Sequence, residues 1–383
     1  MKSFLFSLYL SVIKFVLKAV KTKPDHYVVL NGAGRSGSNG YLFYRYLCQQ
    51  PNVTVTLVEP WPSSHLSWQT WRRIAQAQYV FTTHQPFKIK KNQISVSFWH
   101  GIPLKRMGLM AQNTTRASNR HNVKLWHRQA DYVVSSSDFY ETMMSACVGI
   151  ESSHYIRTGF PRTDALMHPA WSKAKLLQAF FGQTEPDAQL GIYMPTFRFE
   201  LNDPKVMTMI ESGNFFAFDD FSGEALDKSL AARHQYLLIK LHPYEMKLLH
   251  LSQSSYHHLY FMTNDDLLTH HHDLYEWLGS TDFLITDFSS VYLDYLRLNR
   301  PILFTTSHLA AYQHVRGFLF GPYDDVTPGP KAATQKQLLQ QLSHLDPSRD
   351  EQARKRWRLL TDEMPDEGNC ARIFARLAKG DLS

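Results

Sequence analysis

One group of residues with the types needed for proton transfer surrounds His100. The segment 94–98 is rich in β-branched and aromatic residues, which predicts a strand, and Gly101 directly follows the histidine. An imidazole at the carboxyl end of a strand, beside a residue without a side chain, is accessible and can remove a proton from an attacking hydroxyl. Lys105 and Arg106 follow and add positive charge. A polar loop histidine with no catalytic role would give the same pattern.

A second group combines hydroxyl and carboxyl side chains where a strand gives way to a helix. An apolar segment ends at Thr286 and Asp287, and Ser289 and Ser290 then open the segment 291–298, whose apolar residues have helical spacing. A helix start has unpaired N–H groups and a partial positive charge, so serines there are suited to holding a phosphate. The alternative is that Ser289 only caps the helix.

Three further segments supply charged side chains. Lys240 and His242 have the same parity on a strand-like segment, so both can face one side and neutralise charge on a transferring phosphoryl group. Arg198 has a planar guanidinium suited to phosphate. Arg162 and Asp164 lie in a third segment, Gly-Phe-Pro-Arg-Thr-Asp. Each segment alone is weak, because a surface cation usually serves only solubility.

The elements that must position these residues alternate between strands and helices. In the first half, we expect strands at residues 27–30, 53–58, 79–82, 94–98 and 132–135. The helices expected there are residues 41–49, 68–77, 118–130 and 139–148. In the second half, we expect strands at residues 190–193, 236–241, 259–262, 283–286 and 301–304. Helices are expected at residues 273–278 and 291–298, and again from residue 335 onward. Such alternation predicts parallel sheets covered by helices on both faces.

The length of 383 residues and the two sets of strands predict an α/β protein with two Rossmann-like, doubly wound domains facing a cleft, the GT-B arrangement. We expect the first domain at residues 24–175 and the second at 176–345, followed by C-terminal helices at 346–383. Ligands would then bind at the carboxyl ends of strands, facing the cleft.

Residues 1–23 are expected to form an amphipathic helix in a membrane interface. The polar residues recur at steps of three and four, on one narrow stripe: Ser3, Ser7, Ser11, Lys14, Lys18 and Lys21. Lys14 interrupts the apolar length that a spanning helix needs, and most of the lysines lie inside or after the apolar run, whereas a signal peptide has its charge before it. An interfacial helix fits best, and a helix docked on the protein's own surface is the alternative.

Composition limits the partners. The formal net charge of +7 favours anionic ligands or an anionic membrane surface, but no Lys/Arg block has the density of a nucleic-acid tail, so we expect no nucleic acid. The three cysteines are far apart and form no CxxC pair, which is typical of a reducing cytoplasm. Three consecutive histidines at 270–272 would point apart, so we expect no metal there.

Together, these segments resemble the CDP-glycerol glycerophosphotransferases of teichoic-acid and capsule synthesis. The resemblance rests on the ordered set FWHGIPLKRMG, GFPRTD, YMPTFR, LIKLHP and LITDFSSVYLDY, and it covers most of the chain after the first helix. It implies a GT-B fold with a cytidine-diphosphate donor in the second domain and His100 as the base that activates the acceptor hydroxyl. It also implies His242 beside the donor pyrophosphate, with Arg198, Ser289 and Ser290 holding phosphate oxygens.

Other residues complete the expected site. The further donor contacts are Lys240, Thr286 and Asp287. The residues expected to contact the acceptor or support the site are Gly101, Lys105, Arg162, Asp164 and Arg316, the last of which begins a further matching segment, Arg-Gly-Phe. Phe288 departs from the family pattern, which has tyrosine there.

The resemblance implies transfer of glycerol phosphate, or a related polyol phosphate, from CDP-glycerol with release of CMP. The acceptor would be a lipid-linked saccharide on polyprenyl diphosphate or a growing polyol-phosphate chain, at the cytoplasmic face of the cell membrane. No cofactor is expected, and dependence on a divalent metal stays open. A GT-B nucleotide-sugar glycosyltransferase and a non-catalytic membrane-associated scaffold are the alternatives. Glycerol against ribitol, primase against polymerase and the oligomeric state stay open too.

Overall fold

The computed structural model describes residues 2–63, 65–249 and 256–380, and the chain divides into two compact units. Unit 1 contains Met1–His100, Arg116–Asp164 and Met364–Ser383. Unit 2 contains Gly101–Thr115 and Ala165–Glu363. The bounds of these units are not those of the expected domains, and unit 2 resumes at Ala165 where residue 176 was expected. The segment after His100 belongs to unit 2, and the end of the chain returns to unit 1 instead of forming a separate group of helices.

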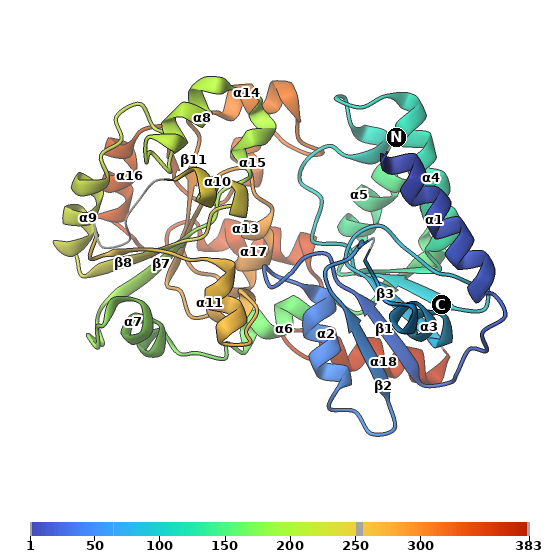
Figure 1. Cartoon of the computed structure of the whole chain (residues 1–383). Coiled ribbons are helices and arrows are strands. Elements are labelled where there is room, and N and C mark those ends of the chain that lie inside the picture. The colour runs from blue at the N-terminus through green and yellow to red at the C-terminus, as the bar shows by residue number, and fades with distance from the viewer. Residues whose placement is uncertain (1, 64, 250–255, 381–383) are drawn as a thin grey trace. The chain divides into compact units, whose positions relative to one another are not determined.

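Unit 1 is built on a parallel sheet (Figure 1). Its strands are β1 (His26–Leu30), β2 (Thr54–Val58), β3 (Tyr79–Thr82), β4 (Ile94–Ser97), β5 (Tyr132–Ser135) and β6 (Tyr155–Arg157). Its helices are α1 (Lys2–Leu17), α2 (Asn39–Leu47), α3 (Trp68–Gln76), α4 (Arg116–Gln129), α5 (Asp138–Val148) and α18 (Asn369–Lys379), with α6 (Pro161–Met167) at the unit boundary.

Unit 2 has its own parallel sheet. Its strands are β7 (Gln189–Tyr193), β8 (Gln235–Ile239), β9 (Leu259–Phe261), β10 (Phe283–Thr286), β11 (Ile302–Thr305) and β12 (Lys331–Ala332). Its helices are α7 (Lys173–Phe181), α8 (Pro204–Glu211), α9 (Gly223–Ala231), α10 (Pro243–Leu248), α11 (Asn264–Thr269), α12 (Tyr275–Leu278), α13 (Val291–Tyr295), α14 (Leu309–Val315), α15 (Tyr323–Val326), α16 (Gln335–Leu342) and α17 (Glu351–Thr361). Every strand expected from the sequence is present with its ends within two residues of the expectation, whereas β6 and β12 were not expected.

The strand order identifies where each sheet can bind a ligand. The order is β2-β1-β3-β4-β5-β6 in unit 1 and β12-β11-β10-β7-β8-β9 in unit 2, and all neighbouring strands pair in parallel. The winding therefore reverses between β1 and β3 in unit 1, and between β7 and β10 in unit 2. Ligands of open α/β sheets bind beyond the carboxyl ends of strands at such reversals.

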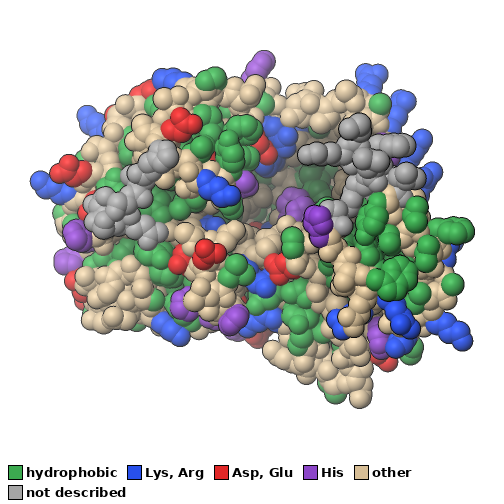
Figure 2. Space-filling model, viewed as in Figure 1, with side chains coloured by type: hydrophobic (Ala, Val, Ile, Leu, Met, Phe, Trp, Pro, Cys, Tyr) green, Lys and Arg blue, Asp and Glu red, His purple; other side chains and the backbone are tan. Residues whose placement is uncertain are grey.

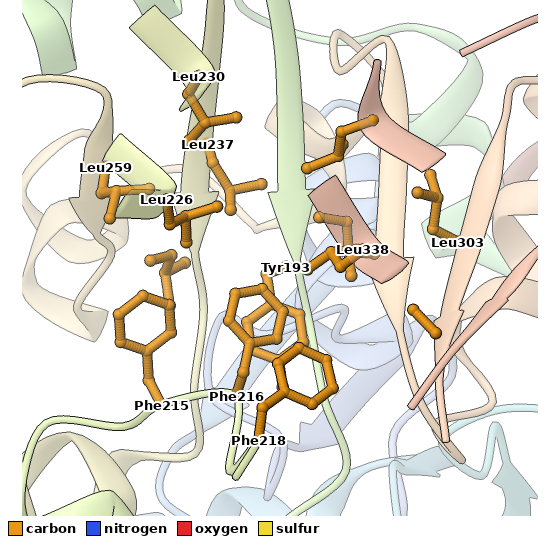
Figure 3. Packing of buried hydrophobic residues seen from close by; sticks show 14 of the residues in the cluster. Tyr193, Phe215, Phe216, Phe218, Leu226, Leu230, Leu237, Leu259, Leu303 and Leu338 are labelled. Atoms are coloured by element: carbon orange, nitrogen blue, oxygen red, sulfur yellow. The ribbon is translucent and has the colours of Figure 1, made fainter. Parts of the chain in front are cut away.

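The core of unit 2 is rich in aromatic side chains. Phe215, Phe216 and Phe218 come from the loop after α8 and pack against β7, where the ring of Phe216 lies 4.0 Å from that of Tyr193 (Figure 3). Leucines from α9, β8 and α16 complete the cluster. Burial of each such side chain contributes about 1.5–3 kcal/mol, so this core holds the sheet firmly beneath the loops at its carboxyl edge.

Helix α1 has two apolar faces. Leu17 is fully buried in the core of unit 1, and Tyr9 accepts a hydrogen bond at its hydroxyl from Trp71 Nε1 (2.9 Å). The exposed apolar side chains of its other face are Val12, Phe15 and Val16. The helix is thus docked on its own unit by only part of its apolar circumference. Among the described residues, none of the helices has the length and hydropathy needed to cross a bilayer.

Gly191 allows close packing inside unit 2. It pairs with Phe283 across β7 and β10, and a Cβ atom at Gly191 would lie 2.1 Å from the Phe283 ring. We therefore expect Gly191→Ala to lower the free energy of unfolding by about 1–3 kcal/mol through overpacking, as measured by urea denaturation. Adding the same change to Phe283→Leu should cost far less, because the ring is gone. An equal cost in both backgrounds would contradict this explanation.

Candidate functional site

His100 lies in a sharply turned segment at the carboxyl edge of the unit 1 sheet. It follows β4, and the flanking residues Trp99 and Gly101 have φ angles of 52° and 131°. Positive φ angles favour glycine, so the backbone itself requires Gly101. Trp99 packs its ring 5.5 Å from that of Trp126 in α4, which anchors the turn. The His100 side chain remains exposed, as a group that acts on a substrate must be.

His84 lies beside His100, and the sequence analysis missed it. It follows β3 as His100 follows the neighbouring β4, and the two imidazole rings are 4.8 Å apart. Burial lowers the pKa of His84, and its Nδ1 lies 3.1 Å from the Thr83 hydroxyl. The signal was available, because both histidines follow strand-like segments. The reversal between β1 and β3 thus lies next to a pair of imidazoles.

Arg162 and Asp164 support unit 1 and do not extend into open solvent. Arg162 is buried, and its Nη1 donates to the His100 carbonyl oxygen (2.8 Å), so it holds the backbone of the catalytic candidate. Asp164 accepts hydrogen bonds from the backbone N–H groups of Asn369 (3.0 Å) and Cys370 (2.9 Å) at the start of α18. Of the two roles considered for them, support is the one that these contacts favour.

Arg198, expected from the sequence to hold a phosphate oxygen, has partners inside unit 2. It is buried, and its Nε and Nη2 donate to the Glu245 carboxylate at 3.3 and 3.1 Å. Its Nη1 donates to the Phe215 carbonyl oxygen, and its backbone N–H donates to Glu245 Oε1 (2.8 Å). Arg198 therefore joins the loop after β7 to α10, and its contact with a phosphate stays a prediction. Sequence reasoning missed this partner because Glu245 is far away along the chain.

Thr286 and Asp287 also organise loops at the reversal in unit 2. The Thr286 hydroxyl donates to the Met194 carbonyl oxygen (2.7 Å). Asp287 is buried and accepts from the backbone N–H groups of Thr196 (2.7 Å) and Phe288 (2.5 Å). Burial raises the pKa of Asp287, while these hydrogen bonds oppose the shift. Both residues therefore tie the loop after β10 to the loop after β7, and their contacts with the donor stay predictions.

His242 and Lys240 combine positive charge with an accessible imidazole at the end of β8. His242 is exposed, its ring stacks 3.9 Å from that of Phe197, and its Nδ1 accepts from the Tyr244 backbone N–H (3.2 Å). The neutral ring then carries its proton on Nε2. Partial desolvation of the ring, assisted by nearby Lys240, lowers the pKa of His242. Burial also lowers the pKa of Lys240 to about 8, and its Nζ donates to Asn264 Oδ1 (2.9 Å).

The two serines lie where the chain enters α13. Ser290 occupies the position before the helix without capping it through its side chain, and Ser289 precedes it. Within residues 256–380 and the other described segments, neither hydroxyl has a hydrogen-bond partner. Phe288, at the position where the family pattern has tyrosine, is buried, and its ring centre lies 4.4 Å from that of Tyr312 in a stacked arrangement. The serine hydroxyls thus remain available at the reversal between β7 and β10.

Lys105 and Arg316 meet at one carboxylate. Lys105 Nζ and Arg316 Nε lie 3.2 and 3.5 Å from Glu200 Oε2, all within unit 2. The segment carrying Lys105 is held in place by backbone hydrogen bonds from Arg106 to Gly317 (3.1 Å) and from Leu319 to Leu104 (2.9 Å). This cluster extends the charged surface of unit 2. In the described residues, no group of three or more His, Cys, Asp or Glu side chains is placed to hold a metal ion.

The Arg198–Glu245 pair gives a direct test of whether Arg198 serves the fold or a phosphate. We expect Glu245→Ala to lower the free energy of unfolding by about 3–5 kcal/mol, because it leaves a buried guanidinium unpaired. The double variant Arg198→Met/Glu245→Leu should recover most of that loss in the same denaturation experiment. If Arg198→Met alone kept full stability and lost only affinity for CDP, the predicted phosphate contact would be right after all.

Comparison with known proteins identifies the family of this chain. A family model described as CDP-glycerol:poly(glycerophosphate) glycerophosphotransferase matches residues 39–377. The teichoic acid glycerol-phosphate primase of Bacillus spizizenii is 29% identical over 274 residues, which cover 70% of this chain and 64% of the primase. The teichoic acid poly(ribitol-phosphate) polymerase of the same species is 27% identical over 66% of this chain and 38% of its own length. The chain thus spans less than two thirds of both relatives.

Solved structures share the fold. The wall teichoic acid polymerase TagF superposes with a TM-score of 0.75 at 20% identity, covering 97% of this chain and 93% of that one. The UDP-GlcNAc 2-epimerase of Neisseria meningitidis, determined with UDP-GlcNAc bound, has a TM-score of 0.51 at 13% identity, over 92% of this chain and 99% of its own. Since the family model matches most of the sequence, the chain belongs to the CDP-glycerol:poly(glycerophosphate) glycerophosphotransferase family.

Proposed function

We propose that this chain transfers glycerol phosphate, or a related polyol phosphate, from CDP-glycerol to a lipid-linked acceptor and releases CMP. One observation carries the proposal: His242, Lys240 and two unengaged serine hydroxyls occupy the carboxyl edge of the unit 2 sheet around its reversal. That combination suits a diphosphate, because it supplies hydrogen-bond donors and positive charge. Family membership supplies the identity of the donor.

The proposed reaction is an in-line displacement at the donor's β-phosphorus. An acceptor hydroxyl attacks while His100 removes its proton, and the bond from that phosphorus to the oxygen of CMP breaks. CMP leaves with the bonding electron pair. Positioning and electrostatic stabilisation supply most of the catalysis in phosphoryl transfers of this kind. The step requires units 1 and 2 to bring His100 and the diphosphate together, as in the GT-B arrangement expected from the sequence.

His242 and Lys240 would stabilise the departing CMP. With Nδ1 already accepting a hydrogen bond, His242 donates from Nε2 to a phosphate oxygen even in its neutral form. Lys240 adds full charge when protonated, and a bound diphosphate favours that form. Ser289 and Ser290 donate from their hydroxyls. No resident cofactor enters this scheme, and the cationic groups supply charge stabilisation that a divalent ion provides elsewhere.

The proposed acceptor is a saccharide on polyprenyl diphosphate or a growing polyol-phosphate chain, at the cytoplasmic face of the cell membrane. The relatives include both a primase and a polymerase, so product length separates these two roles. The experiment is incubation with a defined lipid-linked primer and CDP-glycerol or CDP-ribitol, followed by mass analysis of the product. A single added unit would identify a primase, and a ladder of products a polymerase.

A nucleotide-sugar enzyme is the second candidate, because the fold is shared with a protein that binds UDP-GlcNAc. Release of CMP from CDP-glycerol or CDP-ribitol, with no turnover of UDP-sugars, supports the phosphotransferase. Turnover of a UDP-sugar without CMP release would replace the proposal. Absence of turnover with every donor, in folded protein supplied with primer, would favour the scaffold.

His100 is the residue on which the proposal depends most directly. We expect His100→Ala to lower kcat by about 10²–10⁴-fold, the usual contribution of a positioned general base, while the thermal unfolding midpoint stays near that of the wild type. His127→Ala, which removes an exposed histidine from α4, serves as the matched control. Unchanged CMP release by a folded His100→Ala variant would remove His100 from the mechanism.

Lys240 gives the donor site a characteristic pH dependence. Its pKa is lowered to about 8, so the free protein loses this charge as the pH rises through that value. Affinity for CDP should therefore fall above about pH 8, by at most about tenfold per pH unit. Lys240→Gln should bind CDP more weakly below that pH and show a flatter profile above it. Isothermal titration calorimetry measures both, and identical profiles would contradict the assigned contact.

A further inference from the structure

A pocket lies between α1 and α4 within unit 1. Its volume is about 260 Å³, large enough for a small polar headgroup. Leu10, Phe87 and Leu125 supply apolar walls. Lys14, Lys124 and Arg128 supply cationic ones. The pocket therefore combines an apolar lining with three positive charges.

The charges of this pocket are poorly compensated by the protein. Lys14 is partly buried, its Nζ donates to Gln129 Oε1 (3.2 Å), and it lies 4.3 Å from the centre of the Phe87 ring. Burial and nearby Lys88 lower the pKa of Lys14 to about 8. Lys124 and Arg128 are exposed, and neither forms an ion pair with any residue whose position is described. Neither α1 nor α4 contains an acidic residue.

One lysine of the polar stripe expected along the first helix faces the pocket between α1 and α4. Lys14, which belongs to that stripe, points into the pocket, whereas Val12, Phe15 and Val16 face outward, with Phe15 75% exposed. In Figure 2, hydrophobic side chains gather at the right-hand edge where Figure 1 places α1, and Lys and Arg side chains lie around them. An apolar surface thus adjoins a cationic pocket on the same helix.

We propose that this pocket binds the phosphate-bearing headgroup of an anionic membrane lipid, while Val12, Phe15 and Val16 lie among the acyl chains. The inference rests on the proposed function only in placing the chain at a membrane, and it adds the site and chemistry of attachment. Charge complementarity identifies the headgroup, because uncompensated cations attract an anionic leaflet. The exposed apolar face favours a lipid as the ligand over a soluble phosphate, because only a lipid has acyl chains that can contact this face.

Vesicle co-sedimentation of the full chain tests the pocket. The probes are phosphatidylcholine vesicles with and without phosphatidylglycerol. We expect Lys124→Gln/Arg128→Gln to weaken binding to the anionic vesicles by roughly tenfold or more. The matched control Lys228→Gln/Lys336→Gln removes the same charge from exposed helix positions in unit 2 and should change binding little. If both variants lost vesicle binding equally, net charge alone would explain the effect, and the proposed binding of a headgroup in the pocket would be wrong.

A second variant tests the apolar contact without touching the charges. Phe15→Ser/Val16→Ser replaces exposed side chains, so the fold should persist, and we expect it to weaken vesicle binding as well. Retained binding would refute the acyl-chain contact. Excess inorganic phosphate should not displace the vesicles, and full displacement would assign the pocket to a soluble anion. CMP release by the wild-type chain is measured in parallel. If the wild type releases CMP but does not prefer vesicles that contain phosphatidylglycerol, only this inference is rejected. If it prefers those vesicles but releases no CMP, only the proposed function is rejected.

Discussion

The buried ion pair between Arg198 and Glu245 is the constraint on which the donor side of this molecule depends. It joins the loop after β7 to α10, the helix that His242 begins, so the imidazole is positioned by a contact it does not make itself. Asp287 performs a similar task between the loops after β7 and β10. Buried charges of this kind hold their surroundings in one geometry because any rearrangement leaves an unpaired ion. The accessible groups, His242 and the serine hydroxyls, stand on this internal framework.

Unit 1 positions His100 by a different means. Its turn is shaped by backbone conformation at Gly101 and by packing of Trp99, and the His100 carbonyl is fixed by buried Arg162. Residues in sparsely populated backbone regions persist where their surroundings determine them, and they are common at functional sites. The two units thus share one principle. Among the polar side chains that the sequence marks as candidates for chemistry, a few are exposed. A larger set is engaged in internal contacts that hold the exposed ones in place.

Much of the fold could be predicted because it follows from local pattern. Apolar runs such as those of β3 and β10 identify strands, and their alternation with helices identifies parallel sheets. Contacts between distant segments could not be predicted, because a charged side chain looks the same in sequence whether it meets solvent or a buried partner. For this reason Arg198 was assigned to phosphate and Asp164 was not recognised as a cap of α18. His84 was within reach of the same strand-end reasoning that found His100.

The chain passes between the two units four times, after His100, Thr115, Asp164 and Glu363. The three segments of unit 1 are therefore separated in the sequence by segments of unit 2. During synthesis the sheet of unit 1 is complete long before α18, whose Leu377 carbonyl accepts from the Tyr79 hydroxyl in β3 (3.1 Å). The surface of unit 1 that α18 covers therefore stays uncovered until the ribosome has synthesised all of unit 2. Truncating α18 should consequently impair the half of the molecule that was translated first.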